Sequence, residues 1–205
     1  MSKPTLIYVH DPMCSWCWGF EKVKSELFGY LSKTMNIRQM LGGLAEDSDE
    51  LMSQQMQSML MNTWLKIEST IPGTEFNHNF WRDCAPRRST YPANRAVIAA
   101  RLQGELNEQL MTHEIQKAYY TQAKNPSDLS TLYELAKGLS LDMEQFKTDI
   151  NSTKVESLLT DEIIQVRKMG VSSFPSLLIE KNDQIHYIQH HYSDVNIMLQ
   201  QIEQL

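Results

Sequence analysis

The distribution of strand-like and helical segments most constrains the fold of this chain. Residues 6–9 (LIYV) form a continuous apolar run, which is typical of a strand buried on both faces. Residues 36–40 (NIRQM) and 176–180 (SLLIE) are predicted as further strands, and residues 185–189 follow a turn at Asn182–Asp183 as a hairpin partner. Since a strand needs partners for its backbone, we expect one sheet built from both ends of the chain.

The segments between these strands are predicted to be helical. Apolar side chains recur at one-turn spacing after residue 14 and predict a helix over residues 14–33, which completes a strand–helix–strand unit. Residues 47–169 show helical periodicity almost throughout. The sequence therefore predicts an α/β domain formed by residues 1–46 and 170–205, with residues 47–169 as an all-helical insertion domain.

Local signals place some boundaries inside the predicted insertion. Tyr91–Pro92 is predicted to start one helix, because proline suits the first helical position, and Ser140 to cap a short helix that ends near Ile150. Methionines crowd residues 51–61 (LMSQQMQSMLM). We expect this segment to pack into the core; an adaptable binding surface is the alternative, since methionine suits both.

Composition and charge narrow the classes of function. The formal net charge is −6 and no long block of Lys or Arg occurs, which argues against a nucleic-acid partner. The longest apolar runs are far below the roughly 20 residues that cross a bilayer, so we expect no membrane span. The start MSKPTLIYVHD lacks the features of a secretory signal, and if Met1 is the native start we expect a cytoplasmic protein.

Two cysteines, Cys14 and Cys17, lie in DPMCSWCWGF (residues 11–20), where the first strand gives way to the first helix. The unsatisfied N–H groups and the dipole of a helix N-terminus favour a thiolate over a thiol. The spacing of three residues places both sulfurs on one side of that turn, within reach of each other. Cys14 is predicted to attack a substrate disulfide, and Cys17, one turn deeper, to resolve the mixed disulfide.

Two other interpretations of the cysteines compete with redox chemistry. A structural zinc site needs four ligands, and Cys84 and the six scattered histidines, including His10, offer no companion spacing. Free cysteines are also often simply buried. In the cytoplasm a close pair is more often catalytic than structural, so we favour a redox pair and expect no metal. Cys84 is predicted to be a buried, inert thiol, with a relay thiol as the alternative.

A second motif, GVSSFPSLLIE (residues 170–180), places Pro175 directly before a predicted buried strand. Proline cannot donate a hydrogen bond to a sheet, so the first position of a strand suits it. Periodicity and base rates alone favour an ordinary trans peptide bond at this position.

Together, the order of these motifs along the whole chain resembles the thioredoxin-fold disulfide oxidoreductases of the DsbA type. It is most similar to their cytoplasmic branch of predicted protein-disulfide isomerases, which is related to FrnE-like and 2-hydroxychromene-2-carboxylate isomerase-like proteins. The resemblance implies a thioredoxin-like fold with an all-helical insertion. It also implies that Pro175 is cis and faces the cysteines, and that Phe174 presents its backbone N–H and C=O to an extended substrate.

The resemblance also implies the activity, which is thiol-disulfide exchange through a mixed disulfide with protein or small-molecule substrates. Electrons would come from a thiol reductant system, with glutathione as a candidate redox partner and no bound cofactor. A glutathione-dependent transferase or isomerase of the kappa type is the alternative. Those relatives usually carry serine in place of the first cysteine, so Cys14 favours the redox activity.

Side chains near the cysteines supply candidate substrate contacts. Met13 and Trp16 flank Cys14 and are predicted to form an apolar pad, whereas Trp18 and Phe20 are predicted to pack inward. A local basic cluster contains Arg82, Arg87, Arg88 and Arg95. Such a cluster is usually a solvated face, although it would also suit the carboxylates of glutathione.

Overall fold

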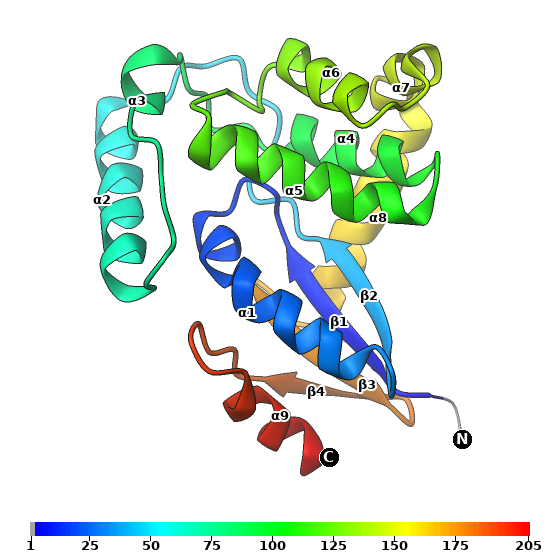
Figure 1. Cartoon of the computed structure of the whole chain (residues 1–205). Coiled ribbons are helices and arrows are strands. Elements are labelled where there is room, and N and C mark those ends of the chain that lie inside the picture. Colours follow the sequence, from blue (N-terminus) through cyan, green and yellow to red (C-terminus); the bar gives the residue numbers. More distant parts are fainter. Residues whose placement is uncertain (1–2) are drawn as a thin grey trace.

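Within residues 3–205, which the computed structural model describes, four strands form one sheet in the order β2-β1-β3-β4 (Figure 1). Residues 1–2 of the predicted range 1–46 lie outside this part. The strands are β1 (Thr5–His10), β2 (Asn36–Leu41), β3 (Ser176–Lys181) and β4 (Gln184–Ile188). β1 pairs in parallel with β2 and antiparallel with β3, which pairs antiparallel with β4. The sheet is therefore built from both ends of the chain, as predicted.

The register between β1 and β3 positions the second motif. Val9 lies opposite Ser176, so the chain that enters β3 reaches the carboxyl end of β1. Register is strongly specified where a face of a strand is buried, because a slip by one residue would move every side chain to the opposite face. Leu6 to His10 are all buried, so this register brings residues 170–175 beside the loop that carries the cysteines.

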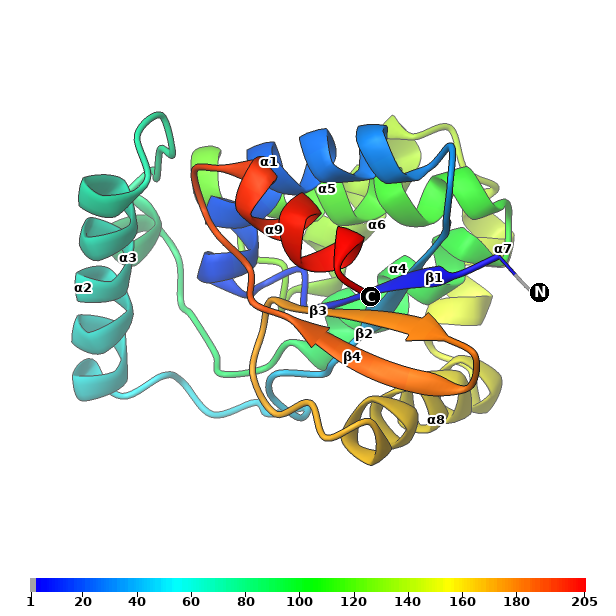
Figure 2. The ribbon, with the colours of Figure 1, turned by 90° about the horizontal axis from the view of Figure 1, so that it is seen from below.

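Within the described residues, nine helices accompany the sheet. They are α1 (Ser15–Leu31), α2 (Gln54–Thr70), α3 (Phe80–Asp83), α4 (Tyr91–Arg101), α5 (Glu105–Thr121), α6 (Leu129–Gly138), α7 (Met143–Ile150), α8 (Thr153–Lys168) and α9 (Val195–Glu203). Figure 2 shows α1 and α9 on one side of the sheet and α8 on the other. Apolar residues of β1 alternate between the two sides: Leu6 and Tyr8 pack with α1 and α9, and Ile7 and Val9 pack with Val166 of α8.

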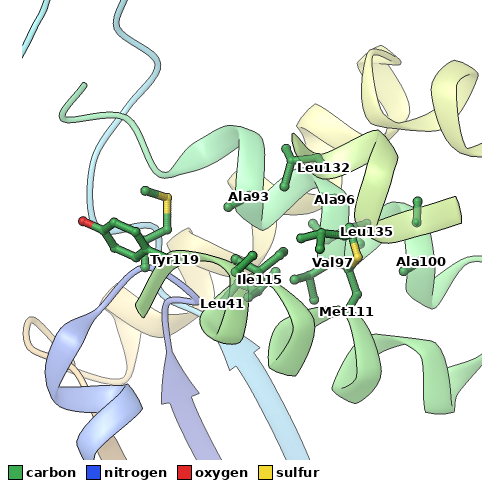
Figure 3. Packing of buried hydrophobic residues seen from close by; sticks show 14 of the residues in the cluster. Leu41, Ala93, Ala96, Val97, Ala100, Met111, Ile115, Tyr119, Leu132 and Leu135 are labelled. Atoms are coloured by element: carbon green, nitrogen blue, oxygen red, sulfur yellow. The ribbon is translucent and has the colours of Figure 1, made fainter. Parts of the chain in front are cut away.

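A separate apolar cluster holds the middle helices together (Figure 3). Small residues of α4, Ala93, Ala96 and Ala100, let α5 approach closely, and Ile115 of α5 fills the gap beside them. Tyr119 lies at the end of this cluster, with its hydroxyl pointing away from the other labelled side chains. α8 contacts both this block and β2. The predicted domain boundary after residue 169 stays a prediction.

Two local expectations are wrong. Asp142, not Ser140, caps α7: its carboxylate accepts hydrogen bonds from the Glu144 and Gln145 N–H groups, and Ser140 has a positive φ of 58° in the preceding turn. The methionine-rich segment does not pack into the core as a whole. α2 buries only Trp64 and Ile67, nearer its carboxyl end, and lies at the edge of the molecule beside α3 in Figure 1.

Two of the methionines of α2 are therefore open to solvent. Met59 is 50% exposed and Met61 is 38% exposed, and Leu65, four residues after Met61, is 54% exposed.

Tyr91–Pro92 starts a helix as predicted, since α4 begins at Tyr91 with proline in its first turn. Among the residues described, no helix has both the length and the apolar character that crossing a bilayer requires.

Candidate active site

Cys14 occupies the N-cap position of α1, at the carboxyl end of β1. Its carbonyl accepts hydrogen bonds from the N–H groups of Cys17 and Trp18, which closes the first turn of the helix. Its side chain makes no capping hydrogen bond, so the thiol is free to face away from the helix. Both cysteines are unpaired thiols, and Cys14 is the more accessible of the two, at 7% exposure against 0% for Cys17.

Cys17 is buried, and its thiol is difficult to ionise. Burial raises the pKa of the Cys17 thiol, and its hydrogen bond to Cys14 raises that pKa further. A contact with Tyr8, a buried residue of β1, opposes the increase in the Cys17 pKa. The two sulfurs therefore have different environments although they lie one turn apart.

Phe174 lies across from Cys14. The Cys14 thiol donates a hydrogen bond of 3.4 Å to the Phe174 carbonyl oxygen, and the peptide bond between Phe174 and Pro175 is cis. The Phe174 ring packs on the backbone of Gly42, just after β2. A Cβ atom at Gly42 would meet two carbons of that ring at 2.0 Å, so only glycine leaves room for it.

A buried carboxylate, Asp11, holds the loop that precedes Cys14. Asp11 is 0% exposed and accepts hydrogen bonds from Met13 N–H at 2.8 Å, Leu44 N–H at 2.8 Å, the Thr90 hydroxyl at 2.8 Å and the Asn94 amide at 2.9 Å. Burial raises the Asp11 pKa, and these four donors oppose the increase. Because Thr90 and Asn94 belong to the start of α4, Asp11 joins the cysteine loop to the helical block.

A groove of about 350 Å³ opens beside Cys14. Cys14, which follows β1, and Ser172 and Phe174, which precede β3, border the groove together with Met59 and Leu60 of α2. The full lining is Met13, Cys14, Ser15, Trp16, Leu44, Met52, Met59, Leu60, Thr63, Arg87, Arg88, Ser89, Thr90, Tyr119, Ser172, Ser173 and Phe174. The structure thus brings Met13, Trp16 and Phe174 of the predicted substrate contacts around the thiol, with Pro175 buried behind them.

The aromatic residues next to the cysteines have separate environments. Trp16 borders the groove, lies against Tyr192 at 5.2 Å between ring centroids, and has the Lys66 ammonium 5.9 Å above its ring. Phe20 is fully buried, as predicted. Trp18 is half-buried and does not border the groove; its indole N–H donates to the Glu75 carbonyl.

Two other candidate residues, His10 and Cys84, do not border the groove. Burial lowers the pKa of His10 to about 3, so the ring is neutral near pH 7, and it stacks on Tyr8. Cys84 is half-buried, donates to the Ala123 carbonyl at 3.1 Å, and has a pKa that burial raises. Within residues 3–205, no group of three or more His, Cys, Asp or Glu side chains has an arrangement that would hold a metal ion.

Sequence reasoning missed Asp11, Thr90 and Asn94. Asp11 opens the decapeptide that contains both cysteines, and a carboxylate three residues before a reactive thiol was a signal that could have been followed. Thr90 and Asn94 gave no such signal, because nothing local links the start of α4 to the cysteine loop.

The chain is similar in sequence to known proteins. A family model described as thioredoxin matches residues 7–197. Among curated proteins, the ClpXP adapter protein SpxH of Bacillus subtilis (strain 168) is 30% identical over 177 residues, which are 85% of this chain and 58% of that protein. The SpxH of Halalkalibacterium halodurans is 25% identical over 94% of this chain and 67% of its own length. The chain thus spans about three fifths to two thirds of these relatives.

Solved structures show the same architecture. A protein from Nitrosomonas europaea, assigned as a protein disulfide isomerase, has a TM-score of 0.85 and 25% identity, with 99% of this chain and 97% of that chain covered. The cytosolic disulfide reductase DsbM from Pseudomonas aeruginosa with GSH has a TM-score of 0.74 and 21% identity, with 98% and 100% covered. The predicted thioredoxin-like α/β fold and the resemblance to DsbA-type oxidoreductases are confirmed.

Proposed function

Because the chain belongs to the thioredoxin family, we propose that it is a thiol-disulfide oxidoreductase that reduces or rearranges disulfides in proteins or small molecules. One observation carries the proposal: Cys14, the more accessible of the two cysteines, occupies the N-cap position of α1 opposite the Phe174 carbonyl, and the buried Cys17 thiol hydrogen-bonds to the Cys14 sulfur. Cys14 and Cys17 are the proposed catalytic residues.

The proposed reaction has two exchange steps. In the first, the Cys14 thiolate attacks a substrate disulfide, a bond forms between Cys14 and one substrate sulfur, and the other sulfur leaves as a thiolate that takes up a proton. In the second, Cys17 loses its proton and attacks the Cys14 sulfur, which releases the second substrate thiolate. The substrate gains two electrons and two protons, and the chain is left with a Cys14–Cys17 disulfide.

Substrate contacts follow from the walls around Cys14. Phe174 forms one side, where its backbone would pair with an extended substrate segment, and the cis-linked Pro175 next to it would hold that backbone in place. Met13 and Trp16 form an apolar pad on the side of α1. Trp16 supplies a large apolar ring and Met13 a flexible side chain that adapts to different neighbours, which suits an enzyme that accepts different disulfides.

The cycle needs an external reductant but no bound cofactor, since the electrons move only between sulfur atoms. We propose that a thiol reductant system of the cytoplasm, with glutathione as one redox partner, returns the Cys14–Cys17 disulfide to two thiols. The bound GSH of the DsbM structure, a protein of the same fold, supports glutathione as a partner. Two glutathione molecules per cycle would be oxidised to one glutathione disulfide.

Serine variants of the three cysteines test the proposal. We expect the wild-type chain to reduce insulin disulfides in the presence of a thiol reductant, and Cys14→Ser to abolish this activity. Cys17→Ser should stop turnover and accumulate a mixed disulfide on Cys14, which mass spectrometry detects. Cys84→Ser is the matched control and should keep full activity. An undiminished turnover of Cys17→Ser would instead favour the glutathione-dependent transferase or isomerase, which needs one thiol or none.

A second candidate function is that of an adapter that binds other proteins, because curated relatives are named ClpXP adapter proteins. The solvent-facing side chains Met61 and Leu65, one helical turn apart, form an exposed α2 face that would suit a protein partner. An adapter needs no thiol chemistry, so a Cys14→Ser, Cys17→Ser double variant would keep partner binding. Met61→Ser with Leu65→Ser, which lie outside the groove beside Cys14, would lose partner binding and keep insulin reduction.

A further inference from the structure

We infer that Arg88 binds a carboxylate carried by the substrate next to its disulfide, so that the groove beside Cys14 selects the disulfides of acidic thiols. This inference rests on the proposed function and names the substrate class of that site. Two arginines border the groove, and one of them has no ion-pair partner within residues 3–205.

The groove is electropositive although the chain is acidic. The chain carries a formal net charge of −6, yet the residues that line the groove include two arginines, Arg87 and Arg88, and no Asp, Glu, Lys or His among the residues described. A concave site lined by one sign of charge concentrates ligands of the opposite sign. An anionic substrate is therefore favoured at Cys14 over the rest of the surface.

Three of the four clustered arginines are already used by the fold. Arg87 pairs with Asp128 at 2.6 Å, Arg95 pairs with Asp47 at 2.6 Å, and Arg82 pairs with Asp83 at 2.7 Å. Arg88 forms no ion pair and donates no side-chain hydrogen bond within residues 3–205. A half-buried guanidinium presents five fixed donors, and those of Arg88 remain available to a ligand.

Arg88 and Tyr119 both border the groove that contains Cys14. Burial raises the pKa of the Tyr119 hydroxyl, and the charge of Arg88 opposes the increase. The Tyr119 hydroxyl points away from the other labelled side chains of the helical cluster (Figure 3). Arg88 and Cys14 thus line one volume.

The remaining lining suits the rest of an acidic thiol. Hydroxyls of Ser89, Ser172 and Ser173 provide hydrogen bonds for peptide groups, and Met52 and Leu60 contact hydrocarbon. The carboxylate could come from a small thiol such as glutathione or from an acidic side chain beside a cysteine in a protein. The chemistry that Arg88 recognises is the same, because a planar carboxylate matches the guanidinium in two parallel hydrogen bonds.

The test compares rate constants for disulfides that differ in charge. The reduced wild-type chain is reacted with glutathione disulfide, which is anionic, and with bis(2-hydroxyethyl) disulfide, which is neutral. We expect Arg88→Gln to lower the glutathione disulfide constant about tenfold relative to the neutral one, as the loss of a charge-assisted hydrogen bond implies. Arg88→Lys should retain part of the preference. Arg82→Gln, an exposed arginine outside the groove, is the control and should leave the ratio unchanged.

Two blocked peptide disulfides that differ only in Glu or Gln next to the cysteine identify the source of the carboxylate. A dependence on Arg88 with glutathione disulfide alone assigns a small thiol, and a dependence with the Glu peptide assigns an acidic protein segment. A ratio that Arg88→Gln leaves unchanged for every anionic disulfide overturns the inference. If the wild-type chain does not react even with the neutral disulfide, the proposed oxidoreductase function itself fails.

Discussion

The Cys14 sulfur lies 3.4 Å from the carbonyl oxygen of Phe174, although 160 positions separate the two residues in the sequence. The contact exists because β3 pairs antiparallel with β1, so that the segment entering β3 arrives beside the loop leaving β1. Gly42 supports it from behind, since the Phe174 ring occupies the space that a larger side chain would take. The position of Phe174 is thus set by β1, β2 and β3 together.

Gly42→Ala should therefore damage both stability and exchange. The new Cβ would press on the Phe174 ring, and overpacking of this kind costs about 1–3 kcal/mol of unfolding free energy. Displacing Phe174 from Cys14 should also lower the rate of insulin reduction by about 10- to 100-fold. Gly29→Ala is the control: nothing lies near its Cβ, and it should stabilise α1 by about 0.5–1 kcal/mol. Equal stabilities for the two variants in urea unfolding would contradict the packing argument.

Asp11→Asn should loosen the cysteine loop from the helical block. The amide would keep one acceptor oxygen and would point its NH2 group at donors that now hydrogen-bond to the carboxylate. We expect a loss of about 2–4 kcal/mol of unfolding free energy and slower exchange at Cys14. Asp183→Asn, at the exposed hairpin turn where φ is 61°, should change stability by less than about 0.5 kcal/mol. Similar urea midpoints for the two variants would refute this role of Asp11.

The buried His10 should make the fold sensitive to acid. Its folded-state pKa, lowered to about 3 by burial, lies below the ordinary value of 6.5, so the unfolded chain binds the proton first as pH falls. The contribution to stability is present above pH 6.5 and is lost toward pH 3, by at most about 1.4 kcal/mol per pH unit. His10→Phe, which can still stack on Tyr8, should flatten unfolding free energy between pH 6.5 and 4, whereas the exposed His113→Gln should not. If unfolding free energy falls with pH as steeply in His10→Phe as in the wild-type chain, His10 is not the source of the acid sensitivity.

Glu108 should destabilise the fold as pH rises, which is the opposite of the effect expected from His10. Burial raises its pKa to about 7, with Arg101 at 3.2 Å opposing and Glu162 adding to the increase. The folded chain therefore holds this proton more tightly than the unfolded chain, and stability present below pH 4.5 is lost as pH rises through 7. Glu108→Gln should remove about 1–3 kcal/mol of that loss, measured by urea unfolding at pH 4.5 and pH 8. Glu134→Gln, at an exposed ion pair, serves as the control, and matching pH profiles in the two variants would contradict the prediction.

Much of the architecture followed from short-range patterns. Periodicity located the sheet strands and α1, and the spacing of Cys14 and Cys17 with the strand before them indicated a helix N-terminus. These features depend on neighbours within a few residues, which is why the sequence carries them. The same patterns misplaced the start of α7, because Ser140 and Asp142 are both good caps and only the turn geometry separates them.

The sequence by itself determined the elements, their order, and a pair of thiols at the junction of the first strand and the first helix. The tertiary structure alone decided that Phe174 faces Cys14, that Asp11 ties the cysteine loop to α4, and that Arg88 borders the groove without an ion pair to any residue of 3–205. Each of these depends on strand register or on partners that are distant in the chain. Local propensity does not encode such partners, because packing and hydrogen bonding across the fold select them.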